Sequence, residues 1–104
     1  MHTLPYLRNF DLTGQVALVT GSARGLGFCI ARALAGCGAR VLINGRNAEA
    51  AAAAAAELTA AGLDAHALPF DISDDAAMER AFQDIDRDHR RLDILVNNVG
   101  ARNR

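Results

Sequence analysis

The 104-residue sequence contains no lysine, no tryptophan and only one tyrosine. No apolar run approaches the length of about 18 residues that a membrane-spanning helix needs. Residues 1–14 show no basic start followed by an apolar core, so we expect no secretory signal peptide. The net charge of −1 excludes an overall basic field that would attract nucleic acid or an anionic membrane. We therefore expect neither nucleic acid nor a membrane as a partner.

Cysteine is also scarce, since the chain holds only Cys29 and Cys37. Both fall on one predicted helix, where the rise per residue separates them by about 12 Å, too far for a disulfide. Two free thiols are typical of a reducing compartment, and we expect a cytoplasmic protein. Both side chains are predicted to be buried as small apolar residues.

Four short apolar runs alternate with three helical stretches. The predicted strands are residues 16–20, 40–44, 66–70 and 92–98, and the predicted helices are residues 27–38, 47–62 and 73–91. Strands that alternate with helices of this length indicate right-handed βαβ units and a parallel sheet covered on both faces. The near-continuous apolar character of the strands fits such burial. The predicted fold class is an open, doubly wound α/β sheet.

Several residues mark the ends and the faces of the predicted helices. Asn47 is expected to cap the N-terminus of the second helix, and Gly62 to lie just beyond its end. The alanine-rich segment between them is expected to pack closely on the sheet as a smooth helix. Ser73 is the predicted N-cap of the third helix. The residues expected to face the core from the first and third helices are Ile30, Leu34, Cys37, Met78, Phe82 and Ile85.

The stretch "VTGSARGLG", residues 19–27, joins the first predicted strand to the first helix. At such a junction the unpaired N–H groups and the positive end of the helix dipole favour an anion. Gly21 would let the strand turn sharply, Gly25 would let the backbone approach a pyrophosphate, and Gly27 would let the helix lie close to the sheet. The missing lysine excludes a Walker phosphate loop, G-x-x-x-x-G-K-[ST]. A purely structural turn stays open as the alternative.

"TGSARGLG", followed further along the chain by "NNVG", resembles the classical short-chain dehydrogenase/reductases, whose usual patterns are T-G-x-x-x-G-x-G and N-N-A-G. The resemblance covers essentially the whole chain, with Val99 in place of the usual alanine. It implies a Rossmann-like sheet, of which residues 1–104 would form a partial domain with the first four strands, in the order 3-2-1-4, and three helices. The cofactor-binding residues that it implies are Gly21, Ser22, Arg24, Gly25, Leu26, Gly27, Asp71, Ile72, Asn98 and Gly100.

The resemblance assigns these residues to different parts of the cofactor. The glycine stretch would line the diphosphate and the adenosine ribose, Asp71 and the backbone of Ile72 would meet the adenine, and Asn98 would lie at the ribose. Asn97 would support the sheet instead. Two purely structural alternatives stay open: Asp71 could simply precede a helix, and the asparagines could only cap a strand end.

The end of the second predicted strand bears on which nicotinamide cofactor is used. A carboxylate there would accept hydrogen bonds from the 2′-hydroxyl of NAD and repel a 2′-phosphate. The sequence has Asn44, Gly45 and Arg46 instead. Arg46 offers a planar fork of donors to a phosphate, and Arg24 could reach the same group. We therefore expect NADP, with NAD as the alternative if Asn44 serves the ribose and Arg46 is only a solvated residue.

The catalytic groups that the resemblance implies are missing from this sequence. The family relies on a tyrosine, a lysine four residues later, a serine and an asparagine on a fourth helix. The single tyrosine, Tyr6, precedes the first predicted strand and has no lysine after it. No catalytic residue is therefore assigned. The strand at 92–98 would be an apolar sheet edge, which favours either a fragment of a longer chain or a homo-oligomer that covers this edge.

Two functions remain open at this point. One is an NADP-dependent oxidoreductase that transfers a hydride to or from a small alcohol or ketone, represented here by its cofactor-binding half. The opening segment and "NNVGARNR" resemble the gluconate 5-dehydrogenase-like branch, which would suggest a sugar acid or a polyol. The other is a non-catalytic dinucleotide-binding module. A Rossmann-like methyltransferase is disfavoured because no acidic residue follows the second strand.

Overall fold

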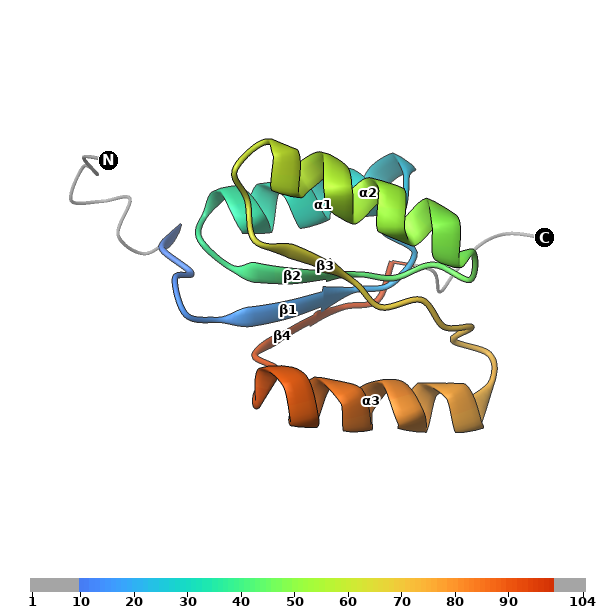
Figure 1. Cartoon of the computed structure of the whole chain (residues 1–104). Helices are drawn as coiled ribbons and strands as arrows, with labels where there is room; N and C mark the ends of the chain where they lie inside the picture. The colour runs from blue at the N-terminus through green and yellow to red at the C-terminus, as the bar shows by residue number, and fades with distance from the viewer. Residues whose placement is uncertain (1–9, 99–104) are drawn as a thin grey trace.

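A computed structural model describes residues 10–98, which form a four-stranded parallel sheet in the order β3-β2-β1-β4. The strands are β1 (Val16–Val19), β2 (Arg40–Ile43), β3 (Ala65–Ala67) and β4 (Ile94–Val96). The helices are α1 (Gly25–Gly36), α2 (Ala48–Ala60) and α3 (Asp75–His89). Figure 1 shows α1 and α2 on one face of the sheet and α3 on the other. The predicted fold class and strand order are therefore confirmed.

Alternation along the strands divides the core into two layers. Ala17 and Val19 of β1 point into the layer beneath α1 and α2, whereas Val16 and Leu18 point into the layer beneath α3. This is the two-residue period of a strand that is buried on both faces. Leu18 lies between Leu42 and Leu95 in the strand register, so β1 occupies the interior of the sheet.

The third strand ends sooner than predicted, at Ala67 instead of residue 70. Pro69 has no N–H and cannot extend the ladder. The segment nevertheless continues beside the end of β2, because the N–H groups of Leu68 and Phe70 donate to the carbonyls of Ile43 and Gly45 at 2.8 and 3.1 Å. The chain therefore reaches the carboxyl edge of the sheet in a fixed position.

The alanine-rich helix α2 packs on the sheet as expected. Its buried residues are Ala51, Ala54, Ala55 and Leu58. Asn47 caps it by accepting a hydrogen bond from the N–H of Ala50 at 2.9 Å, and Gly62 follows its end with a φ of 87°. Both predicted helix-end residues are therefore confirmed.

The predicted core face of α1 is confirmed in part, since Ile30 and Leu34 pack against the core but Cys37 does not. The helix buries Gly27, Ala31 and Ala35, whereas Ile30 and Leu34 are half-buried at the border of the core. Small residues along the contact let the helix axis approach the sheet, and the larger side chains then lie at its sides. The prediction that both cysteines are buried was wrong, because Cys29 and Cys37 are exposed. Cys29 lies outside the contact stripe, and Cys37 is the C-cap of α1.

Helix α3 departs from the prediction at its start. Its N-cap is Asp74, which accepts a hydrogen bond from the N–H of Ala77 at 3.1 Å, and not Ser73. The N–H and the hydroxyl of Ser73 instead donate to Oδ1 of Asp71, at 2.9 and 2.7 Å.

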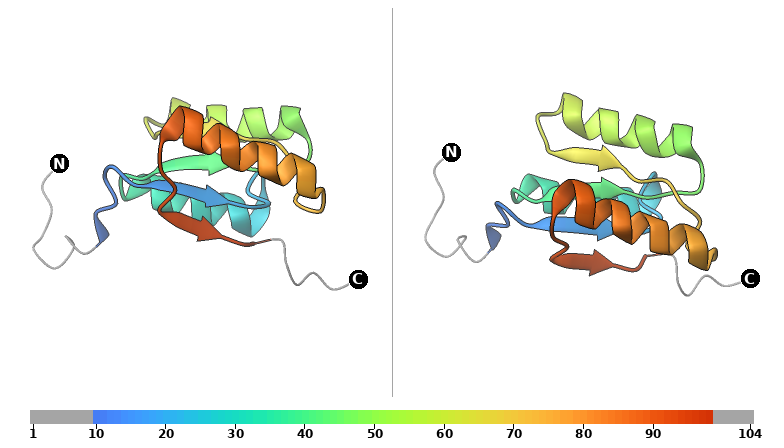
Figure 2. Two further views of the ribbon diagram at one scale, coloured as in Figure 1. Left: turned by 90° about the horizontal axis from the view of Figure 1, so that it is seen from below. Right: turned by 60° about the horizontal axis from the view of Figure 1, so that its bottom comes forward.

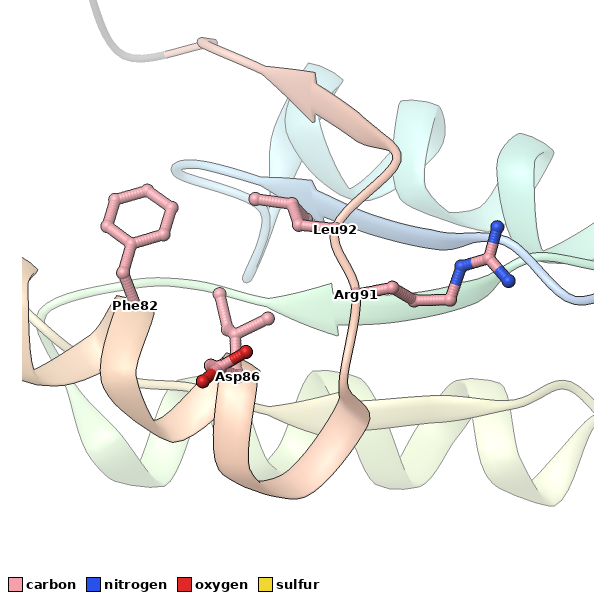
Figure 3. Close-up of a pocket in the computed structure, with 5 residues that line it drawn as sticks. Phe82, Asp86, Arg91 and Leu92 are labelled. Atoms are coloured by element: carbon pink, nitrogen blue, oxygen red, sulfur yellow. The ribbon is translucent and has the colours of Figure 1, made fainter.

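Phe82 was expected in the core but is 36% exposed, whereas Ile85 is buried and Met78 is half-buried. Phe82 lines a shallow hollow of about 120 Å³ between α3 and the approach to β4. Figure 3 shows Leu92 directed toward Phe82, with Arg91 pointing away from both. Phe82 lies in the middle of α3, and within residues 10–98 the sheet has no strand beyond β4.

Strand β4 forms one edge of the sheet, as predicted, and pairs with β1 alone among the described residues. Figure 2 shows β4, in red, at this edge, and β3, in yellow, at the opposite one. Leu95 at its centre is 56% exposed. None of the three helices between residues 10 and 98 is long and apolar enough to cross a membrane.

Candidate functional site

The loop after β1, the start of α1 and the ends of β2 and β4 meet at the carboxyl edge of the sheet. Gly21 and Gly25 have φ values of 62° and 65°, in the left-handed region that favours glycine. A Cβ atom at Gly27 would overlap the carbonyl oxygen of Gly21 and would lie 2.7 Å from Nδ2 of Asn98. Glycine is therefore favoured by the backbone at positions 21 and 25, and position 27 has no room for a side chain.

Helix α1 begins here without a side-chain cap. Its N-cap, Arg24, is extended, with φ −164° and ψ 173°, and the first turn holds no acidic residue. The carbonyl of Arg24 accepts the N–H of Phe28 at 3.4 Å. The N–H groups of the first turn lie before this bond, at the positive end of the helix. Arg24, Gly25 and Leu26 are exposed around them, so the edge can receive an anion.

Ser22 is part of this loop and is fully buried. Its hydroxyl donates to the carbonyl of Val19 at 2.6 Å and accepts the N–H of Asn44 at 2.9 Å. Its own N–H donates to the carbonyl of Asn44 at 2.8 Å. Ser22 thus holds the loop against the end of β2.

Asn44, the residue after β2, is only 2% exposed. Its Oδ1 accepts the N–H of Gly21 at 3.1 Å, and its Nδ2 donates to the carbonyls of Leu68 and Phe70 at 3.3 and 3.1 Å. From the sequence, Asn44 was expected only as a possible partner of the NAD ribose. The signal for its structural role is a polar residue directly after a buried apolar strand, since a buried amide needs partners within the protein.

The end of β4 is joined to the glycine loop through Thr20, a residue that was not among the predicted site residues. The hydroxyl of Thr20 accepts the N–H of Asn98 at 2.9 Å and lies 3.3 Å from Oδ1 of Asn97. Nδ2 of Asn98 donates to the carbonyl of Gly21 at 3.3 Å. Asn98 therefore contacts the turn directly, and Asn97 contributes to the connection between β1 and β4.

Asp71 and Ile72 lie between β3 and α3, and Asp71 closes the turn that leads into the helix. Hydrogen bonds from the hydroxyl and the N–H of Ser73 lower the pKa of the Asp71 carboxyl, and the positive charge of Arg46 lowers it further. Ile72 is half-buried against the core layer under α3, and Arg46 is exposed. Tyr6 and Gly100 lie outside the described residues.

The assembled site offers backbone donors, a positive helix end and two exposed guanidinium groups. The sequence between residues 10 and 98 contains neither a tyrosine nor a lysine, so this edge holds no Tyr-x-x-x-Lys pair. Its chemistry is therefore suited to binding an anionic ligand.

Comparison with known proteins gives consistent results. Residues 15–104 match the sequence model of the short chain dehydrogenase family. The chain is 44% identical to gluconate 5-dehydrogenase of Gluconobacter oxydans, over 91% of this chain and 37% of that protein. It is 50% identical to the rhamnolipids biosynthesis 3-oxoacyl-[acyl-carrier-protein] reductase of Pseudomonas aeruginosa, over 88% of this chain and 36% of that protein.

A similar solved structure is that of a gluconate 5-dehydrogenase from Burkholderia cenocepacia in complex with NADP and tartrate. The TM-score is 0.88 at 40% identity, over 95% of this chain and 39% of that one. The chain thus spans little more than a third of the length of the relatives that it matches.

Proposed function

Because this chain belongs to the short-chain dehydrogenase/reductase family, we propose that it is the cofactor-binding part of an NADP-dependent oxidoreductase. Residues 1–104 would form a partial Rossmann domain. The observation that carries the proposal is the uncapped start of α1, which lies beside two glycines of positive φ and directly against Asn98. An anionic diphosphate suits this combination of close backbone approach and unpaired N–H groups.

We assign the parts of the cofactor as follows. The diphosphate and the adenosine ribose lie along the loop and the first turn of α1, with Ser22 holding the loop against the end of β2. The adenine lies against Asp71 and the backbone of Ile72, and the nicotinamide ribose lies near Asn98. The residues of this proposed site are Gly21, Ser22, Arg24, Gly25, Leu26, Gly27, Arg46, Asp71, Ile72, Asn98 and Gly100.

NADP is the cofactor that the charges favour. No carboxylate stands at the end of β2, and the exposed Arg46 follows two residues after the buried Asn44. A guanidinium recognises a phosphate through paired hydrogen bonds. The similar gluconate 5-dehydrogenase structure holds NADP, which supports the same choice here. NAD is expected to bind more weakly.

The reaction of the proposed oxidoreductase is hydride transfer between the nicotinamide and an alcohol or ketone carbon. The similarity to gluconate 5-dehydrogenase supports a small sugar acid or polyol as the substrate. The tyrosine and the lysine that such chemistry needs are not in this sequence, so the 104-residue chain itself is proposed to bind cofactor without turnover.

Two further properties belong to the same proposal. The outer edge of β4, with its exposed Leu95, favours association with another polypeptide, and we propose a homo-oligomer. The two free thiols favour a cytoplasmic location.

A calorimetric titration of the purified chain with NADPH and NADH tests the proposal, together with an assay of NADPH oxidation in the presence of ketones. We expect NADPH to bind, NADH to bind more weakly, and no oxidation to occur. If neither dinucleotide binds, the proposed function is wrong. If the chain oxidises NADPH, the assignment of the catalytic groups to a region outside this sequence is wrong.

A further inference from the structure

We propose that Asn44 is a positioning residue that joins the two loops of the nucleotide site and does not itself contact the cofactor ribose. This inference rests on the proposed function. The two loops are the diphosphate turn at Gly21 and the segment 68–70, which leads to Asp71 and Ile72. One side-chain amide would thus set the distance between the parts of the site that hold the diphosphate and the adenine.

The hydrogen bonds of Asn44 leave its amide no free donor. Oδ1 accepts the N–H of Gly21, and the two hydrogens of Nδ2 go to the carbonyls of Leu68 and Phe70. The reverse orientation of the amide would set the donor group against an N–H and the acceptor against two carbonyls, so only one orientation satisfies all three partners. With 2% of the residue exposed, a ribose hydroxyl has no access to it.

The connection is not supplied by the backbone alone. The N–H groups of Leu68 and Phe70 already pair with the end of β2, whereas their carbonyls are taken up by the Asn44 side chain. The Gly21 N–H lies at a turn with positive φ and has Asn44 Oδ1 as its acceptor. Removing the amide would therefore leave one donor and two acceptors at the carboxyl edge to be satisfied by water or by movement of the loops.

Asn44 occupies a position after the second strand where a carboxylate would favour NAD over NADP. Asn44→Asp would thus ordinarily be expected to favour NAD, but the hydrogen bonds of Asn44 predict a different result. An aspartate at this position has no donor, and one of its oxygens would face the carbonyls of Leu68 and Phe70. Asn44→Asp would keep an acceptor for the Gly21 N–H but would release the segment 68–70, and would therefore weaken the binding of both dinucleotides without creating a preference for NAD.

The test compares Asn44→Asp and Asn44→Ala with Asn47→Ala, which removes the exposed N-cap of α2 and touches neither loop. The affinities for NADPH and NADH are measured at a temperature at which circular dichroism shows each variant to be folded. We expect both Asn44 variants to lose about tenfold or more in affinity for each dinucleotide, with the NADPH/NADH ratio kept, as the loss of buried hydrogen bonds at a binding loop predicts. Asn47→Ala should lower the unfolding temperature and leave both affinities unchanged.

Two results would overturn the inference. A shift of the ratio toward NADH in Asn44→Asp would mean that this residue contacts the ribose. Unchanged affinities in folded Asn44→Ala would mean that the loops do not need the amide.

A second measurement does not depend on cofactor binding. In the ligand-free wild-type chain, amide hydrogen exchange should be slow at the N–H of Gly21 and at the side-chain amide of Asn44. Rapid exchange at both groups would contradict the inference even if the variants fail to fold. If the wild-type chain binds no dinucleotide but both groups are protected, the proposed function fails and the connection between the loops stands.

Discussion

Nη1 of Arg40, at the start of β2, lies 3.3 Å from Nδ1 of His89, in the last turn of α3. A guanidinium can only donate, so Nδ1 of His89 accepts and this imidazole is neutral in the contact. Asp64 binds Arg40 and His66 at 2.9 and 2.8 Å, and the rings of His66 and His89 meet edge to face at 5.4 Å. These four side chains connect α3 to the amino-terminal ends of β2 and β3, at the opposite end of the strands from the candidate site.

This contact predicts a loss of stability in mild acid. Burial lowers the pKa of His89, and the positive charges of His66 and Arg40 lower it further, whereas Asp88 and Asp64 act in the opposite direction. The unfolded chain then takes up the proton first, so the free energy of unfolding falls as the pH drops below the ordinary histidine value of about 6.5. Urea unfolding at a series of pH values between about 7.5 and 5, above the range in which carboxyls titrate, measures this slope.

His89→Gln keeps a hydrogen-bond acceptor but cannot titrate, so its unfolding free energy should vary less across this range. The same slope in the wild type and in the variant would show that His89 is not responsible.

The start of α3 provides a second prediction. Asp74→Ala removes the side chain that accepts the N–H of Ala77 and should lower the free energy of unfolding by about 1 kcal/mol, the usual value for an N-cap. The neighbouring Asp75→Ala, within the first turn, should cost less because it removes only a favourable charge near the helix dipole. Chemical denaturation of both variants shows which substitution lowers the free energy of unfolding more. A larger effect at Asp75 would contradict the assignment of Asp74 as the cap.

Arg46 is the side chain expected to distinguish the two cofactors. Arg46→Ala should lower the affinity for NADPH by about ten- to a hundredfold, the range for a lost charge-assisted hydrogen bond to a phosphate. The affinity for NADH should change little. Arg80→Ala removes a positive charge that is also exposed, from α3, and is the matched control. Calorimetric titration of each variant with both cofactors measures the difference. An equal loss of affinity for NADPH and NADH would mean that Arg46 does not bind the 2′-phosphate.

The exposed edge strand predicts self-association. Leu95→Lys places a charge on the outer strand β4 and should shift the chain toward the monomer without a large change in stability. Phe10→Lys changes another exposed apolar residue, outside the sheet, and should leave association unchanged. Sedimentation velocity at several concentrations measures the proportions of monomer and oligomer. A wild-type chain that stays monomeric at high concentration would contradict the proposed homo-oligomer.

The fold could be predicted from the sequence because its information is local. Apolar runs such as "VALV" and "RVLI", separated by helical stretches, already define a parallel doubly wound sheet. The errors had two sources. The exposure of Phe82 depends on how α3 packs on the assembled sheet, whereas the choice between Ser73 and Asp74 as the N-cap is local, because two capping residues stand next to each other in the sequence.

The candidate site was predictable to the extent that it depends on glycine and on strand ends. The positions of Gly21, Gly25 and Gly27 follow from the strand–turn–helix pattern. The role of Asn44 did not follow, because its three partners come from the glycine loop and from the segment after β3. Only the assembled sheet brings these segments together.

The most direct test of the central claim compares the affinity of Gly27→Ala and Gly36→Ala for NADPH with that of the wild-type chain. Both changes add one methyl group to α1, but the Cβ at position 27 would overlap the carbonyl of Gly21, whereas the Cβ at position 36 would meet open space. If the uncapped start of α1 holds the cofactor diphosphate, Gly27→Ala should lose about tenfold or more in affinity, as a displaced binding loop predicts, and Gly36→Ala should bind as the wild type does. Equal affinity of all three chains for NADPH, or no binding by the wild type, would contradict the account.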